Sequence, residues 1–134
     1  MVAIPQPTIA GQRAAPSAMV DRTLIFHFFG TSLGRYFTTN IEDAKTAISN
    51  GALGTNNRVV CIKQSSATNG TIFELCYNPD GKSVIERHIK DFTLSSSLVS
   101  TADVGAIIAE AAEAAPANSY AMVFAGHGTG WIPR

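Results

Sequence analysis

Residues 120–134 read Tyr-Ala-Met-Val-Phe-Ala-Gly-His-Gly-Thr-Gly-Trp-Ile-Pro-Arg. The first six are mostly apolar, which predicts a buried strand over 120–125. This strand leads into His127, which Gly126 and Gly128 flank. In open α/β sheets, ligands bind at the carboxyl ends of the strands. We therefore expect the central strand of an α/β sheet, with a histidine held at the sheet's edge.

Other apolar runs bounded by turn residues predict the remaining strands. The first covers 23–29 and the second covers 58–63. A third, over 71–77, lies between the turn sequences Asn69-Gly70 and Asn78-Pro-Asp-Gly81, and we expect it to form either a hairpin with 83–89 or an excursion at the edge of the sheet.

Two helices are predicted between these strands. Apolar residues at helical spacing from Phe37 to Ile48, with a capping box of Thr39 and Glu42, indicate the first, and Asn50-Gly51 ends it. The second starts near Ser100 and Thr101 and ends at Pro116. This order predicts an α/β fold with an open, mostly parallel sheet flanked by helices. Because three main strands and two helices make only half of a typical doubly wound sheet, we expect partner strands from elsewhere.

Composition excludes several classes of partner. The 10 basic residues equal the 10 acidic ones and form no stripe, which argues against nucleic acid and anionic membrane surfaces. No apolar run approaches the ~18 residues of a membrane span. Residues 1–22 lack a contiguous apolar segment, so we expect a flexible lead-in there and one domain portion over 23–134. Two cysteines permit one disulfide and leave the redox compartment open.

His127 is the residue best placed for chemistry. An imidazole with a pKa near ~6.5 can accept and return a proton at neutral pH. The flanking glycines allow a sharp turn and a close approach to substrate, and the Gly128 N–H is a candidate oxyanion donor. The alternative is a chemically idle histidine in a tight turn. A metal site is not predicted, because the three histidines show no ligand spacing with the cysteines.

The block Met122-Val-Phe-Ala-Gly-His-Gly128, followed by Gly130-Trp131, resembles the histidine motif of the clostripain-type (C11) cysteine peptidases, members of the caspase-like clan. The start of the chain, 23–44, is similar to the start of that family. The resemblance spans 23–134, although only the last dozen residues are specific. It implies a caspase-like sheet that a second, heavy chain completes. That chain would carry the nucleophilic cysteine and the acidic residue that binds a basic substrate side chain.

The resemblance also implies roles for individual residues. His127 would be the general acid/base of a Cys/His dyad, and the Gly128 N–H would form part of the oxyanion hole. Thr31 and Ser32 follow the first strand and would border the substrate, although the family usually has a more acidic loop there, such as Gly-Asp-Asn. Family members are cut after Arg or Lys into light and heavy chains, so Arg134 is the expected processing site. No cofactor is implied; calcium dependence occurs in some members only.

The expected function is a cysteine endopeptidase that cleaves proteins or peptides after Arg, with Lys as second choice, and that is exported from a bacterium. One alternative is a non-enzymatic α/β binding domain trimmed by another protease. A second keeps catalysis within the chain, with Cys61 as the nucleophile. The pattern Val-Val-Cys-Ile favours a core position for Cys61 instead, and Cys76, His27 and His88 are likewise expected to be structural or solvated.

Overall fold

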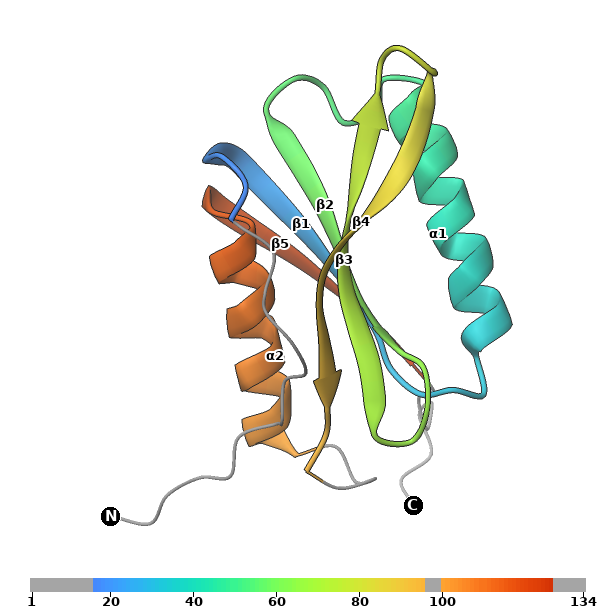
Figure 1. Ribbon diagram of the computed structural model, residues 1–134, viewed down its shortest axis with the longest axis vertical. Coiled ribbons are helices and arrows are strands. Elements are labelled where there is room, and N and C mark those ends of the chain that lie inside the picture. The colour runs from blue at the N-terminus through green and yellow to red at the C-terminus, as the bar shows by residue number, and fades with distance from the viewer. Residues whose placement is uncertain (1–15, 96–99, 127–134) are drawn as a thin grey trace, which may run out of the picture.

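The computed structural model describes residues 16–95 and 100–126, which form a five-stranded sheet between two helices (Figure 1). In chain order the elements are β1 (Val20–Phe28), α1 (Gly34–Ser49), β2 (Asn57–Gln64), β3 (Asn69–Asn78), β4 (Ser83–Thr93), α2 (Thr101–Ala114) and β5 (Ala117–Ala125). Neither of the helices in this part of the chain is long and apolar enough to cross a bilayer.

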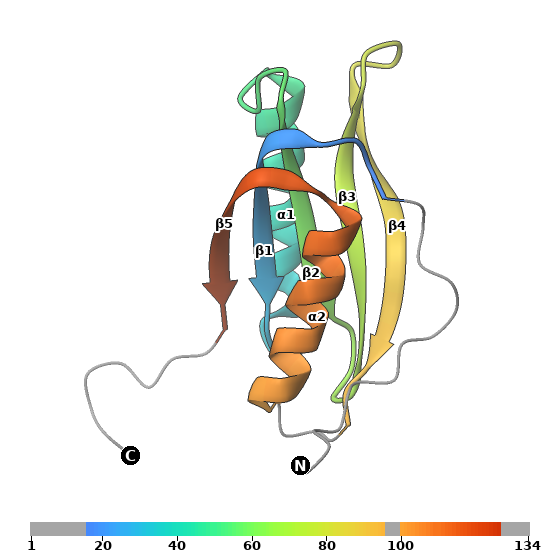
Figure 2. The same ribbon diagram turned by 90° about the vertical axis from the view of Figure 1, so that its left-hand side faces the viewer.

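The strand order is β4-β3-β2-β1-β5. β1 pairs in parallel with both β2 and β5, whereas β3 is antiparallel to its neighbours β2 and β4. Four of the five described strands therefore run in one direction, which confirms the predicted mostly parallel sheet with its hairpin. Right-handed crossovers that move along a sheet in opposite directions place their helices on opposite faces. The α1 crossover leads from β1 to β2 and the α2 crossover leads back to β5, so each face has one helix (Figure 2).

Alternating side chains on the strands fill a core on each face of the sheet. Ile107 and Ala111 of α2 pack against one face, and Phe37 and Ile41 of α1 pack against the other. β2 is apolar on both faces, because it lies inside the sheet under both layers. The buried strand residues on the α2 side are Ile25, Val60, Ile62, Ile72 and Ile89, and those on the α1 side are Phe28, Val59, Cys61, Phe73 and Leu75.

The helix ends agree with the sequence prediction at α2 and disagree at α1. Ser100 caps α2, and its Oγ accepts a hydrogen bond from the Asp103 backbone N–H at 3.1 Å. The capping box predicted at Thr39 is wrong: α1 already begins at Gly34, and the Thr39 hydroxyl donates to the Arg35 carbonyl inside the helix. A threonine in a helix interior can bond to the preceding turn in this way, so its hydroxyl did not mark a helix start.

The residues ahead of β1 are hydrogen-bonded to a partly buried polar cluster. Ser17 Oγ donates to Glu74 Oε1 at 2.8 Å, and Arg87 Nη2 donates to both of these oxygens. Burial alone would raise the pKa of Glu74, but the hydrogen bonds from Arg87, Ser17 and Cys76 and the nearby Arg58 charge lower it overall. The Glu74 carboxylate therefore remains charged and holds Ser17 by its hydrogen bond. β1 starts at Val20, three residues before the predicted Thr23.

β5 differs from the prediction in its place in the sheet. The sequence predicted a central, buried strand, but β5 has β1 on one side and no described strand on the other. Three of its large apolar side chains are exposed to 43–58%: Tyr120, Val123 and Phe124. Among the described residues β5 is therefore an edge strand with an unpaired and largely apolar border.

Two glycine-to-alanine variants test the packing of this fold. A Cβ at Gly70 would overlap the Phe92 ring and lie 2.7 Å from the Lys63 backbone oxygen. We expect Gly70→Ala to lower the free energy of unfolding by about 1–3 kcal/mol. Gly105 in α2 has nothing within 4 Å of such a Cβ, so Gly105→Ala should raise stability by up to ~1 kcal/mol. Urea unfolding midpoints measure both; equal shifts in the two variants would contradict the described packing.

Candidate active site

Three parallel strands end together at one edge of the sheet. Phe28 at the end of β1 lies opposite Lys63 on β2 and opposite Ala125 on β5. In open α/β sheets, this edge is where ligands bind. The chain leaves β5 through Gly126, so the segment that contains the predicted active-site histidine starts here. His127, Gly128 and Arg134 themselves lie outside the described residues.

Gly126 lies in close contact with the neighbouring strand. The Phe29 N–H donates to the Ala125 carbonyl at 2.8 Å, which carries the β1–β5 pairing one residue beyond β1. A Cβ at Gly126 would lie 3.3 Å from the Cβ of Phe29 and 3.6 Å from its carbonyl oxygen. A side chain at position 126 would therefore crowd the Phe29 side chain just after β1, which gives a physical reason for glycine before the predicted histidine.

The loop after β1 turns beside this edge. Gly30 has a φ of +84°, a conformation that favours glycine, and its N–H donates to Gln64 Oε1 at 2.9 Å. Thr31 and Ser32 are exposed, and the Thr31 carbonyl accepts the Gly34 N–H at the start of α1. The structure thus brings Thr31 and Ser32 to the predicted end of the sheet, while their substrate-binding role stays a prediction.

His27 lies on β1 beside the same edge but is buried. It is paired with Phe124 across the strands, and its ring centroid lies 3.7 Å from that of Phe29 and 5.6 Å from that of Phe124. Burial lowers its pKa to about 4, and its Nδ1 has no hydrogen-bond partner within the described residues. A neutral, enclosed ring agrees with the structural role expected for His27. His88 is exposed, with Nε2 3.0 Å from Asp91 Oδ1.

Neither cysteine has the environment of a nucleophile. Cys61 is fully buried on the α1 side of β2, and burial raises the pKa of its thiol to about 12. Burial, followed by the hydrogen bond to Glu74, raises the pKa of Cys76 to about 11. Both are free thiols, so the disulfide that the sequence permitted is not formed. Thiolate is the reactive form, and the structure therefore argues against Cys61 as the partner of His127.

A cavity of 460 Å³ lies beside the loop after β1, on the α1 side of the sheet. Thr31 lines it together with Lys63 and Gln64 from the end of β2. Neither Lys63 nor Gln64 was predicted as a site residue: Lys63 was expected only as the last residue of the second strand, and Gln64 lay beyond it. Their position at the carboxyl end of a parallel strand was the available signal. Among the residues placed by the structure, no three His, Cys, Asp or Glu side chains are grouped to hold a metal ion.

Comparisons with known proteins found similarity in structure only. No protein-family model and no curated protein matches the sequence. A clostripain from Bacteroides thetaiotaomicron, solved with the peptide inhibitor BTN-VLTK-AOMK, is 24% identical with a TM-score of 0.75. A secreted C11 cysteine protease from the same species is 23% identical with a TM-score of 0.76. An inactive zymogen C11 protease from Parabacteroides distasonis is 25% identical with a TM-score of 0.71. These similarities confirm the caspase-like fold that the C11 resemblance implied.

The matches differ in how much of each solved chain they cover. The match covers 87% of this chain and 97% of the clostripain chain. It covers 87% of this chain but only 33% of the secreted protease, and 90% of this chain but 34% of the zymogen. The same fold portion thus forms almost all of one solved chain and about a third of two others.

Alkylation tests the inert environment of Cys61. With a pKa of about 12, only about one thiol in 10⁴ is ionised at pH 8. We expect iodoacetamide to leave Cys61 unlabelled in the folded protein and to label it after unfolding in urea, as mapped by mass spectrometry. Labelling of Cys61 in the folded state, with parallel loss of peptide hydrolysis, would restore it as a candidate nucleophile.

The buried His27 predicts a pH-dependent stability. Its ring takes up a proton near pH 6.5 in the unfolded chain but only near pH 4 in the folded one. Stability is therefore intact above pH 6.5 and falls as the pH drops toward 4, by about 3 kcal/mol from this residue. We expect His27→Phe, which keeps an aromatic ring, to remove that part of the pH dependence in urea unfolding measured at pH 7 and pH 4. Parallel pH curves for the two proteins would show that His27 is not buried as described.

Proposed function

We propose that the chain is the histidine-bearing part of a clostripain-type cysteine endopeptidase that cleaves after basic residues. The observation that supports this most is the position of β5. Its pairing with β1 brings Ala125 and Gly126, from which the chain continues to His127, to the carboxyl edge of a caspase-like sheet and next to Phe29, where the loop with Thr31 and Ser32 begins. The histidine motif over 122–128 and the fold of the described residues each indicate the C11 peptidases.

In the proposed reaction, His127 accepts the proton of a cysteine thiol, and the thiolate attacks the scissile carbonyl. The Gly128 N–H stabilises the negative charge that forms on the carbonyl oxygen. The imidazolium then gives its proton to the leaving amine as the peptide bond breaks and a thioester remains. Water, with His127 again as base, hydrolyses the thioester and returns the free thiol.

The nucleophile has to come from another segment. The sequence contains two cysteines, and both have raised pKa values in partly or fully buried positions. β5 presents an unpaired edge with Tyr120, Val123 and Phe124 exposed, which is a ready template for a further strand. We infer that a heavy chain from the same precursor pairs with β5 and places its cysteine near His127. The solved C11 chains of which this chain covers about a third support that inference.

Two observations support cleavage after a basic residue. The Bacteroides thetaiotaomicron clostripain was solved with a peptide inhibitor whose peptide letters, VLTK, end in lysine. Arg134 is the first basic residue after Lys90, and it follows β5 closely. Arg134 is therefore the first Lys or Arg after β5 that an enzyme of this specificity would cut, and we propose self-cleavage there. Arg is the preferred residue in the proposal and Lys the second. The acidic residue that binds this side chain would come from the heavy chain.

Export from a bacterium is part of the same proposal. One of the similar structures is described as a secreted C11 protease, and the species of all three are bacteria. The alternative, a non-enzymatic binding domain trimmed by another protease, draws support from the same exposed β5 edge, which would also serve for binding.

Substitution of His127 in the full precursor tests the proposal. We expect His127→Ala to lower hydrolysis of a small Arg-amide substrate by at least ~10²-fold, because proton transfer is lost. The same variant should remain uncut, as seen by intact mass. The matched control is His88→Ala, an exposed histidine on β4, which should keep both activities.

The precursor also separates self-processing from trimming. Purified His127→Ala precursor, incubated alone, should stay intact, whereas added wild-type enzyme should cut it after Arg134. Arg134→Gln in an otherwise active precursor should block that cut. Cutting of the isolated His127→Ala precursor to the wild-type extent would rule out self-cleavage, and normal hydrolysis by it would rule out the mechanism.

A further inference from the structure

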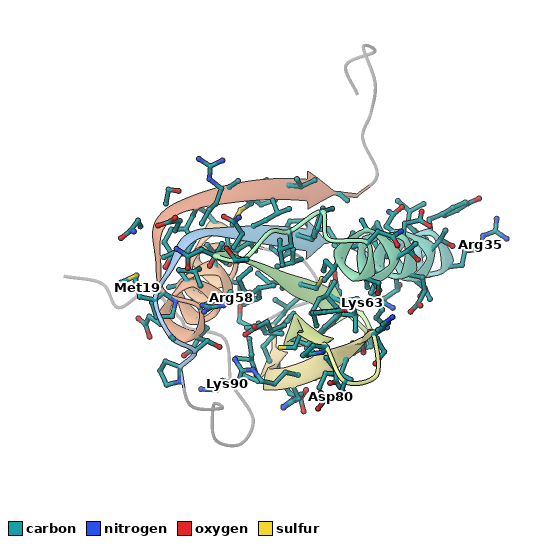
Figure 3. All side chains as sticks on the ribbon, turned by 90° about the horizontal axis from the view of Figure 1, so that it is seen from above. Met19, Arg35, Arg58, Lys63, Asp80 and Lys90 are labelled. Carbon is teal, nitrogen blue, oxygen red and sulfur yellow. The ribbon has the colours of Figure 1, made fainter. Side chains whose placement is uncertain are left out.

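The cavity beside the loop after β1 lies on the α1 side of the sheet, between α1 and the strands β2, β3 and β4. Its lining comes from Thr31 in the loop, Thr38 in α1, Lys63 in β2, Phe73 in β3 and Glu86 in β4. Figure 3 shows Lys63 between α1 and the β3–β4 hairpin. Apart from Phe73, these side chains carry hydroxyl or charged groups, so the cavity suits a polar side chain better than an apolar one.

Two charged side chains line the cavity, and within the described residues Glu86 has an ion-pair partner whereas Lys63 has none. The Glu86 carboxylate lies 3.1 Å from Lys45 Nζ and is paired with it. Lys63 Nζ donates to Thr38 Oγ1 at 3.1 Å and has no carboxylate within ion-pair distance among the described residues. An ammonium group has three donors. Lys63 therefore offers unused donors and a positive charge that forms no ion pair within the described residues.

Two other polar side chains that line the cavity, those of Thr71 and Gln64, already have partners. The Thr71 hydroxyl donates to Asp91 Oδ1 at 2.9 Å, and Asp91 also contacts His88. Gln64 accepts from the Gly30 N–H and donates to the Ala67 carbonyl. The bond to Gly30 connects the cavity wall to the loop that turns beside the active edge. Lys63 is thus a charged group of this cavity with donors available for a ligand.

The position of Lys63 relates this cavity to the end of β5, from which the chain continues to His127. Lys63, Phe28 and Ala125 lie in one row across β2, β1 and β5. Neighbouring strands are about 4.8 Å apart, so Lys63 lies about 10 Å from Ala125 across the sheet. An extended peptide advances about 3.4 Å per residue and covers the same distance in about three residues. A substrate bound across the strand ends would therefore reach the cavity with its third or fourth residue from the cut.

We propose that the Lys63 cavity is a substrate subsite that selects an acidic side chain three or four residues from the scissile bond. This rests on the proposed function and adds to it the class of substrate: peptides with a basic residue at the cut and a carboxylate at that spacing. The carboxylate would accept a charge-assisted hydrogen bond from Lys63 Nζ. Because the ion pair is partly exposed, salt should weaken the selection.

Peptide libraries with a fixed Arg at the cut test the inference in the full mature protein. Each position up to four residues on either side carries Glu, Gln or Lys in turn, and kcat/KM is measured. We expect one position, three or four residues away, at which Glu exceeds Gln by about fivefold, which corresponds to about 1 kcal/mol. Lys63→Met should bring that ratio close to one, and Lys63→Glu should reverse the order of Glu and Lys.

The matched control is Lys82→Met, which removes the same charge from the turn at the other end of the hairpin and should keep the wild-type ratio. A preference for Glu that persists in Lys63→Met, or no preference at any of the positions, would overturn the subsite. Hydrolysis of the short Arg-amide tests the proposed function separately. If the wild-type protein does not hydrolyse it, the peptidase is refuted. If it does, but without selection for an acidic residue, only the subsite is refuted.

Discussion

The parallel pairing of β1 with β2 on one side and with β5 on the other organises this structure. The register places Phe28 between Lys63 and Ala125, so three strands end together at one edge. The two crossovers lead away from β1 in opposite directions, and right-handed connections then place α1 and α2 on opposite faces. Both the loop with Thr31 and the segment after Gly126 start from this edge. The proposed chemistry depends on that coincidence more than on any single contact.

The second constraint is the border of β5. An edge strand that exposes Tyr120, Val123 and Phe124 leaves backbone donors and acceptors together with apolar area in contact with water. In the proposed enzyme the heavy chain removes this exposure and supplies the thiol at the same time. Completion of the sheet and completion of the active site would then be one event, since the strand that covers the border also carries the nucleophile.

Much of the fold could be predicted because local patterns carried the information. Apolar runs between turn residues located four of the five described strands, the turn after Asn78 located β4, and Ser100 before Asp103 located the start of α2. Thr39 misled the prediction because a threonine hydroxyl can bond to the preceding helical turn as well as cap a helix. Cys61 was placed in the core correctly from its apolar neighbours. Of the candidate site, the sequence identified Thr31 and Ser32 beside the active edge but missed Lys63 and Gln64.

The sequence by itself determined the strand–helix order, the mostly parallel sheet and the Gly-His-Gly segment at the end of a strand, because these depend on periodicity and residue type within short windows. Within the described residues, only the tertiary structure decided that β5 is an edge strand, that Lys63 lines a cavity without forming an ion pair, and that the Gly30 N–H bonds to Gln64 across 34 positions of sequence. Strand order and the pairing of distant polar groups depend on how separate segments pack, and no local pattern contains that information.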